Sequence, residues 1–305
     1  MPGSIGLRQY KIFVTERGRH DFVDTRSATL LPNLERHIDT FFSTHSSNVN
    51  ERGLERSWRI EEIEKDAAGC SRGIIYYGTY GFESDLQDQD TGETNYTRKP
   101  TDIEIIPLFY EILLPEGEDF ALASFQSFMG RSCIAALLSR FKSEFEATND
   151  GRLLKALKIM PNDSEGSALS MRSVKGLTLI SRHTTSDITD RLFSGDDADH
   201  VRVSLNISAG RKKRLGTLGD LLQSVPPSGV IAYAGFEFDD AVAHVRVGNR
   251  TRPVGVFGAN RDVGVVDITE DVTFSMNGHP TFESVKIQAD QILSDLYEPL
   301  AGTRR

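Results

Sequence analysis

The chain has 305 residues and a net charge of −9, with 44 Asp and Glu against 35 Lys and Arg. Its 38% hydrophobic and 26% charged residues are typical of a folded protein and exclude a disordered one. No stretch approaches the ~18 consecutive apolar residues of a membrane span. The N-terminus has no apolar segment of signal-peptide length, so we expect a cytoplasmic protein without membrane contact.

The first half of the sequence predicts strands closed by helices. An alternating apolar pattern predicts a strand at 8–15, and Pro32-Asn33 precedes helical spacing that runs to Phe42. Four β-branched and aromatic segments with little room between them then predict an antiparallel meander, at 57–63, 73–82, 104–114 and 120–128. A helix should follow and cover the meander with the apolar residues Met129, Cys133, Ile134, Leu137, Leu138, Phe141 and Phe145.

The second half repeats the order of strands and then a helix. Predicted strands lie at 174–182, 200–208, 229–238, 241–248, 252–258 and 262–269. Within 200–208, Val201, Val203, Leu205 and Ile207 should face inward. Short helices are expected at 184–193 and 217–225, and Gly248-Asn249 suits a hairpin turn. A closing helix carries Val285, Ala289, Ile292, Leu293 and Leu296 on one face.

These patterns together predict an α+β fold of two lobes, each a mostly antiparallel sheet covered by one long helix and shorter helices. The Pro, Asn, Ser and Gly residues of 161–170 predict a linker. We therefore expect an acidic N-terminal lobe at 1–160 and a charge-neutral C-terminal lobe at 171–305, because residues 201–305 hold twelve acids and twelve bases.

The familiar cofactor and metal motifs are missing from the sequence. It has no GxxxxGK[ST] loop and no GxGxxG at a strand-to-helix turn, and its two cysteines, Cys70 and Cys133, cannot make a zinc site alone. The acidic stretch 85–93 resembles a calcium loop, but Lys99 stands where its last carboxylate belongs, so we interpret it as a solvated hairpin tip. We expect no metal and no cofactor.

A metal-dependent nuclease with a dispersed carboxylate site is the alternative that the sequence leaves open. Such a site needs carboxylates and a lysine near the ends of neighbouring strands. The residues that offer parts of it are Glu104, Glu237, Asp239, Asp240, Glu283 and Lys286. No spacing joins these residues, and Glu283 and Lys286 fall on the predicted closing helix.

A run of four cations, Arg211, Lys212, Lys213 and Arg214, stands between a predicted strand and a predicted helix. Arg246, Arg250 and Arg252 lie on a nearby predicted hairpin, so one surface could collect seven bases for a nucleic acid or a partner. The run could equally be a solvated loop tip. A third interpretation is docking to an acidic surface, such as the strip 83–119 of another copy or of a partner. The nearest aromatic residues for base stacking are Tyr233, Phe236 and Phe238.

Residues 72–145, from "RGIIYYGTYGFESDL" through "LLSRFKSEF", and the segment "NGHPTFESVKIQADQIL" resemble uncharacterised prokaryotic proteins encoded among mobile-element and anti-phage defence genes. The resemblance rests on the order of strands and helices and assigns no catalytic residue. It implies an accessory protein of a defence system that meets a partner protein, a second copy of itself, or nucleic acid through the C-terminal lobe.

Overall fold

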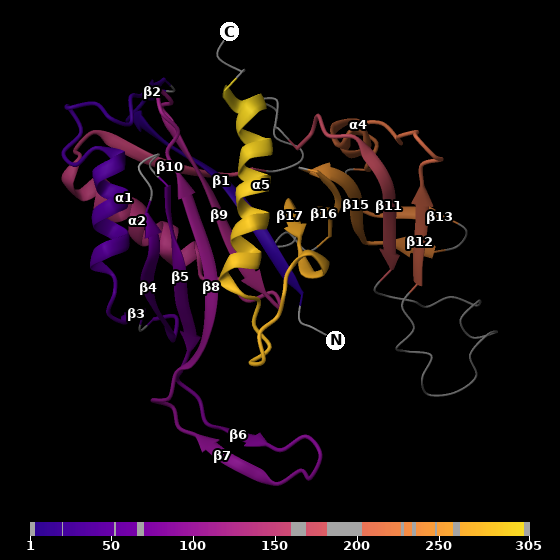
Figure 1. Cartoon of the computed structure of the whole chain (residues 1–305), viewed down its shortest axis with the longest axis horizontal. Coiled ribbons are helices and arrows are strands. Elements are labelled where there is room, and N and C mark those ends of the chain that lie inside the picture. The colour runs from indigo at the N-terminus through magenta and orange to yellow at the C-terminus, as the bar shows by residue number, and fades with distance from the viewer. Residues whose placement is uncertain are drawn as a thin grey trace. The chain divides into compact units, whose positions relative to one another are not determined.

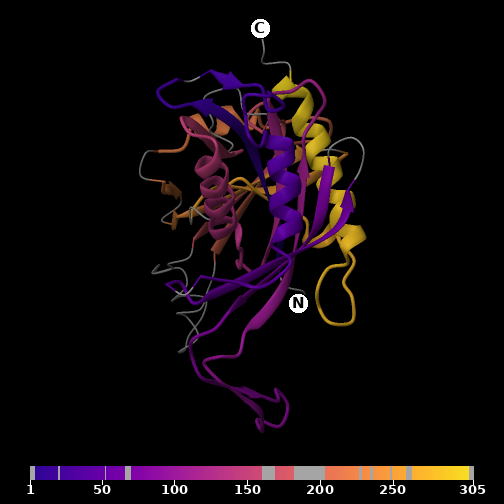
Figure 2. The ribbon, with the colours of Figure 1, turned by 90° about the vertical axis from the view of Figure 1, so that its left-hand side faces the viewer.

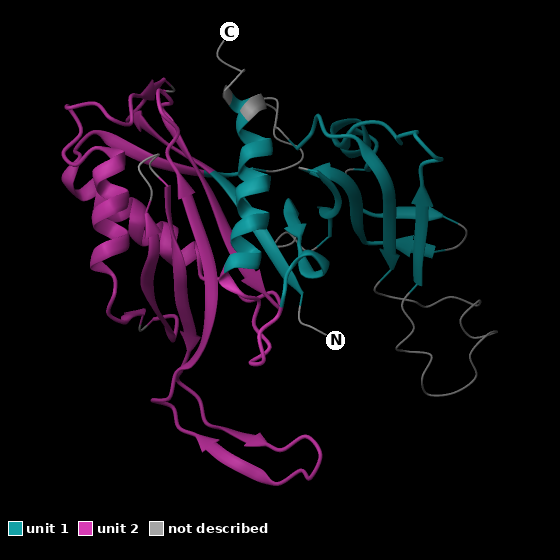
Figure 3. Cartoon of the chain, viewed as in Figure 1, with its two compact units in different colours: residues 1–10, 157–273, 283–305 teal, residues 11–156, 274–282 magenta. Residues whose placement is uncertain are grey.

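The computed structural model describes residues 4–19, 21–51, 53–65, 70–159, 169–181, 203–226, 229–233, 236–247, 249–258 and 263–301. The chain forms two compact units (Figure 3): unit 1 is residues 1–10, 157–273 and 283–305, and unit 2 is residues 11–156 and 274–282. The units change over at residue 157, whereas the predicted N-terminal lobe ends at 160. Residues 161–168 of the predicted linker lie outside the described residues.

The residues that the structure describes in the first half of the chain form ten strands and two helices (Figure 1). In order they are β1 (Ile5–Glu16), β2 (Phe22–Val23), α1 (Leu34–Thr44), β3 (Val49–Glu51), β4 (Arg56–Lys65), β5 (Cys70–Thr79), β6 (Ser84–Gln87), β7 (Thr94–Arg98), β8 (Glu104–Leu113), β9 (Phe120–Phe128), α2 (Ile134–Thr148) and β10 (Arg152–Lys158). In unit 2 the strand order is β1-β9-β8-β5-β4-β3, and β2 and β10 also pair with β1.

The antiparallel meander is confirmed: β4 pairs with β5, β5 with β8, and β8 with β9, each antiparallel. The hairpin of β6 and β7 is inserted between β5 and β8 as a separate two-stranded sheet. Figures 1 and 2 show this hairpin extending beyond the ends of the meander strands. The expected hairpin tip at 85–93 is therefore correct.

The core of unit 2 joins the two helices to the meander through aromatic side chains. The Phe42 ring stacks on Tyr110 with centroids 4.5 Å apart, and Phe41 lies 5.0 Å from Phe141 of α2. Trp58 is 1% exposed beneath them. Each such ring buries roughly 150–250 Å². The helical spacing of the sequence was therefore a sound guide to this core.

The start of α2 differs from the prediction. The helix begins at Ile134, and Met129 is 63% exposed in the preceding turn with φ +48°. The turn bonds Phe128 and Arg131 to each other through their backbones, so Met129 is held outside the helix. The other six apolar residues of the predicted face are buried.

In the second half of the chain, the described residues form seven strands, two α-helices and one short 3₁₀ turn. These are β11 (Val174–Ser181), β12 (Val203–Ser208), α4 (Leu218–Gln223), β13 (Ile231–Tyr233), β14 (Phe236–Phe238), β15 (Asp240–Val247), β16 (Arg250–Phe257), β17 (Val265–Asp267), η2 (Thr269–Asp271) and α5 (Phe282–Ala301). In unit 1 the strand order is β12-β11-β15-β16-β17-β1, and β11, β12, β15 and β16 pair antiparallel.

Helix α5 buries the five residues that the sequence assigned to its apolar face, each 1% exposed or less. Strand β12 lies at the sheet edge, so of the residues expected to face inward Val203 and Leu205 are only partly buried and Ile207 is 40% exposed, while Val201 lies outside the described residues. The strand expected at 229–238 is instead a hairpin of β13 and β14. The helix expected at 184–193 lies outside the described residues. No helix of the described residues is long and apolar enough to cross a membrane.

Candidate docking surface

A loop of consecutive cations connects β12 to α4, and both of its ends are fixed to strand β11. Ala209 N–H donates to the Lys175 carbonyl at 2.9 Å, and Leu215 N–H donates to the Val174 carbonyl at 2.9 Å. Because backbone hydrogen bonds satisfy both ends, residues 210–216, the basic loop, form an ordered projection beside β11.

The tip of the basic loop is a tight turn. Lys213 N–H donates to the Gly210 carbonyl at 2.8 Å, and Lys212 has φ +59°. Gly or Asn is favoured at such a position, because the left-handed conformation costs other L-residues roughly 1–2 kcal/mol. Lys212 therefore carries a backbone cost, and unfavourable backbone geometry of this kind concentrates at functional positions.

The four predicted cations of the basic loop, Arg211, Lys212, Lys213 and Arg214, are all exposed. No ion pair of the described residues involves any of the four. Hydrogen bonds from Thr217 are the main cause that lowers the pKa of the Asp220 carboxyl. The charge of Arg214 acts on the same carboxyl and lowers its pKa by a smaller amount. The loop therefore presents its positive charge to solvent.

Two further cations lie beside the basic loop. The Lys175 ammonium donates to the Lys213 carbonyl at 2.7 Å. Arg246 is exposed on β15, and its N–H donates to the Ser173 carbonyl at 3.3 Å. Ser173 directly precedes β11 and also forms a β-bridge with Thr217, just after the basic loop. The backbone of Arg246 therefore lies about 4.8 Å, one strand spacing, from the segment to which the loop is attached. The sequence-based reasoning found Arg246 but missed Lys175.

Arg250 and Arg252 do not belong to this surface, which corrects the predicted cluster of seven bases. Arg252 is 1% exposed; its Nε lies 3.0 Å from the Asp271 carboxylate, and its Nη2 donates to the side chains of Gln288 and Gln291 on α5. Arg250 remains exposed but forms an ion pair with Asp271. Both arginines therefore form ion pairs with the single carboxylate of Asp271.

The aromatic residues considered for base stacking are remote from the basic loop. Strand β14 follows the opposite end of β11, where Asp239 N–H donates to the Ile180 carbonyl at 3.1 Å. The six residue-to-residue steps from Val174 to Ile180 span about 20 Å at the usual rise of a strand. Phe238 is buried as well. The surface therefore lacks cations interleaved with stacking rings.

Apolar side chains, in contrast, lie close to the basic loop. Leu215, within the loop itself, is 41% exposed. Met171 is 68% exposed in the turn that leads into β11, and Ile207 is 40% exposed on the strand that leads into the loop. A charged rim beside exposed apolar side chains is the usual composition of a protein-binding patch.

The residues proposed for a nuclease site do not gather. Glu104 belongs to unit 2, where it pairs with Arg98 at 3.4 Å. In unit 1, Glu283 and Lys286 form an i,i+3 pair at 3.8 Å on α5, whereas Asp240 is buried at the start of β15. No group of three or more His, Cys, Asp or Glu within the described residues could hold a metal ion.

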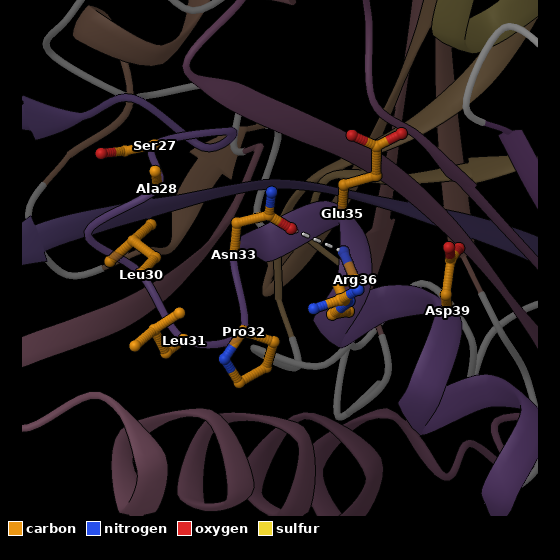
Figure 4. A pocket seen from close by; sticks show the side chains of 9 residues that line it. All are labelled: Ser27, Ala28, Leu30, Leu31, Pro32, Asn33, Glu35, Arg36 and Asp39. Carbon is orange, nitrogen blue, oxygen red and sulfur yellow. Dashed lines mark hydrogen bonds between the residues drawn. The ribbon is translucent and has the colours of Figure 1, made fainter.

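Unit 2 has an open depression of about 730 Å³ between the segment 27–33 and the first turns of α1 (Figure 4). Its two carboxylates already have partners: Glu35 pairs with Arg26 at 3.4 Å, and Asp39 with Lys65 at 2.7 Å. The hydrogen bond that the Lys65 ammonium donates to Asp39 is also the main cause that raises the pKa of Lys65. These pairs leave the depression without a free acid–base couple.

Comparison with known proteins finds no protein-family model that matches the chain and no matching curated protein. The candidate surface is therefore assigned from its own residues.

Proposed function

We propose that this chain is an accessory interaction subunit whose basic loop docks an acidic surface of a partner protein. The observation that carries the proposal is the ordered row of four exposed cations, Arg211 to Arg214, none of which forms an ion pair with a carboxylate of the described residues. Exposed charges of one sign steer encounter and select a complementary partner. The exposed Leu215 and Met171 supply apolar contact area beside them.

Nucleic acid is the alternative occupant of the same loop, and two observations weigh against it. The stacking aromatics lie at the far end of β11, and the exposed apolar residues would gain nothing from a phosphate backbone. The net charge of −9 also resides entirely in residues 1–200 and would repel a polyanion there.

The resemblance of residues 72–145 and 277–293 to proteins encoded among anti-phage genes extends this proposal to a cytoplasmic, partner-binding subunit of a prokaryotic defence system. The nuclease alternative gains no support from the described residues, since no group of three or more His, Cys, Asp or Glu among them could hold a metal ion.

Zero-length crosslinking of carboxylates to lysine amines in an extract of the native host tests the proposal. We expect Lys212 and Lys213 to couple to acidic peptides of a defined protein. The quadruple change of Arg211, Lys212, Lys213 and Arg214 to Gln should weaken binding to that purified protein. The matched control changes Arg17, Arg19, Arg36 and Arg140, which are exposed elsewhere, to Gln.

Both variants alter net charge equally, so a loss confined to the loop variant locates the docking surface. Equal affinity of loop variant and wild type would overturn the proposal. Binding to a defined DNA duplex or RNA strand, with a salt slope reduced by about 0.7–0.9 per lost phosphate contact, would assign the loop to nucleic acid instead.

A further inference from the structure

The hairpin of β6 and β7 has a rigidly built base. Its last residue, Arg98, has a side chain only 6% exposed, and the guanidinium lies 4.3 Å from the centre of the Phe82 ring. Arg98 also donates to the carbonyls of Asp102 and Thr79 and pairs with Glu104 at 3.4 Å. Residues 82–98, the hairpin arm, therefore project from unit 2 as an ordered element (Figures 1 and 2).

The hairpin arm is strongly acidic. Its segment 83–97 contains no Lys or Arg and five acids, which are Glu83, Asp85, Asp88, Asp90 and Glu93. Asp88 accepts the backbone N–H groups of Thr91 and Asp90 at 2.9 Å each, and these bonds lower the pKa of its carboxyl. The tip is thus both negatively charged and conformationally fixed.

One face of the hairpin arm is apolar and uncovered within unit 2. Leu86 and Tyr96 are directly opposed across the two strands and are 55% and 49% exposed. Phe82, at the base, is 49% exposed. Hairpins that need no partner usually protect such faces with charge or with a covering element, because uncovered apolar strands associate.

The hairpin arm and the basic loop are therefore complementary in two respects. The arm offers five carboxylates beside Leu86 and Tyr96, and the loop surface offers Arg211 to Arg214 beside Leu215 and Met171. We infer that the hairpin arm of one copy docks on the basic loop of a second copy. This inference rests on the proposed function and names the occupant of that surface.

Such an interface is heterologous, because the arm and the loop are different surfaces of the same chain. Each copy then still has one free arm or one free loop after pairing, so the contact repeats and generates a ring or an open chain of subunits. Its ionic part should weaken in salt, since exposed charges are screened beyond roughly 10 Å at 0.1 M and 3 Å at 1 M.

The test is the mass of the purified full-length chain by sedimentation velocity, over a wide range of concentration at low and high salt. We expect the wild type to associate with rising concentration and to become monomeric at about 1 M salt. Arm reversal (Asp85→Lys, Asp88→Lys, Asp90→Lys) and loop reversal (Arg211→Glu, Lys212→Glu, Lys213→Glu, Arg214→Glu) should each weaken association at least about tenfold.

Mixing the two variants restores opposite charges on both possible contacts, so the mixture should assemble again although neither variant does alone. Combining both reversals in one chain should have the same effect. A control with Arg17→Glu and Arg36→Glu should associate like the wild type. Leu86→Ser should weaken association at low salt without changing how steeply association falls as the salt concentration rises, because its contribution is apolar.

Three results would overturn the inference. These are a wild type that stays monomeric at every concentration, reversals that do not change its mass, and a mixture of the variants that fails to assemble. The proposed function would still stand if Lys212 and Lys213 crosslink to a different protein in host extract. The proposed function would also be wrong only if the loop substitutions left the binding of that host protein unchanged.

Discussion

Replacing Asp271 should destabilise unit 1 more than replacing the buried arginine that it neutralises. Arg252 is 1% exposed, whereas the Asp271 side chain is 14% exposed and also pairs with Arg250. Asp271→Asn removes the carboxylate and leaves the buried guanidinium with neutral amides alone as partners, which should cost about 3–5 kcal/mol. Arg252→Met keeps much of the volume of the arginine side chain and leaves Asp271 paired with Arg250. We therefore expect the free energy of unfolding to fall by only about 1–2 kcal/mol.

The two changes together should cost less than the sum of their separate effects, because the double variant leaves no buried charge alone. Arg250→Met removes the exposed partner of the same carboxylate and should cost below about 1 kcal/mol. Hydrogen exchange of peptides from β16 and α5 is the suitable measurement, since the single tryptophan, Trp58, lies in unit 2 and reports on that unit.

Additive effects, or a larger cost for Arg252→Met than for Asp271→Asn, would refute this reasoning. Either result would mean that the guanidinium finds water or another partner when the carboxylate is removed. The asymmetry between the two single variants is the informative quantity, because it depends on the different burial of the two ions and not on how tightly they pair.

The remaining predictions concern the unit 2 core, its pH dependence and the tip of the basic loop. Leu137→Ala should lower the free energy of unfolding in urea by about 2–5 kcal/mol, because the leucine side chain is 1% exposed. A decrease below about 0.5 kcal/mol would contradict its place in the core. Burial lowers the pKa of His37, so on acidification the unfolded state binds the proton before the folded state does. The free energy of unfolding of unit 2, followed by Trp58 fluorescence, should therefore fall as pH falls below about 6.5. His37→Asn should remove the contribution of this residue to that pH dependence. Lys212→Asn should leave the stability of unit 1 unchanged or raise it by about 1 kcal/mol, and a clear loss would mean that the lysine side chain itself holds the turn.

The spacing of apolar residues along the sequence correctly predicted the elements that bury one apolar face. The closing helix shows this best, because Val285, Ala289 and Leu296 repeat at helical spacing and are buried on one face of α5. The meander strands were equally predictable, since no helical pattern falls between them and few residues separate β4 from β5 or β8 from β9; only the β6–β7 hairpin lengthens the connection from β5 to β8. Strand β10 was missed, because its sequence RLLKALK is a good helix-forming sequence and only its pairing with β1 makes it a strand.

The sequence-based prediction placed Arg252 on the wrong side of its strand. Arg252 was placed on a solvent surface because it is an arginine on a hairpin. It shares its side of β16 with Val254 and Val256, which are 0% and 3% exposed. That alternation was visible in the sequence and would have placed Arg252 on the covered side. Its counter-ion Asp271 comes from the distant η2, however, and no local pattern announces such a partner.

Local rules fail most clearly at the two surfaces that we propose to interact. Lys212 adopts a backbone conformation that suits glycine or asparagine, and Leu86 and Tyr96 expose an apolar pair on a hairpin surrounded by carboxylates. Each choice is unfavourable for the isolated chain, since one strains a turn and the other leaves apolar surface in water. Departures from local consistency tend to coincide with function, because a partner can offset a cost that the fold alone does not. Two such departures with opposite charge, on one chain, are what a directional contact between copies requires.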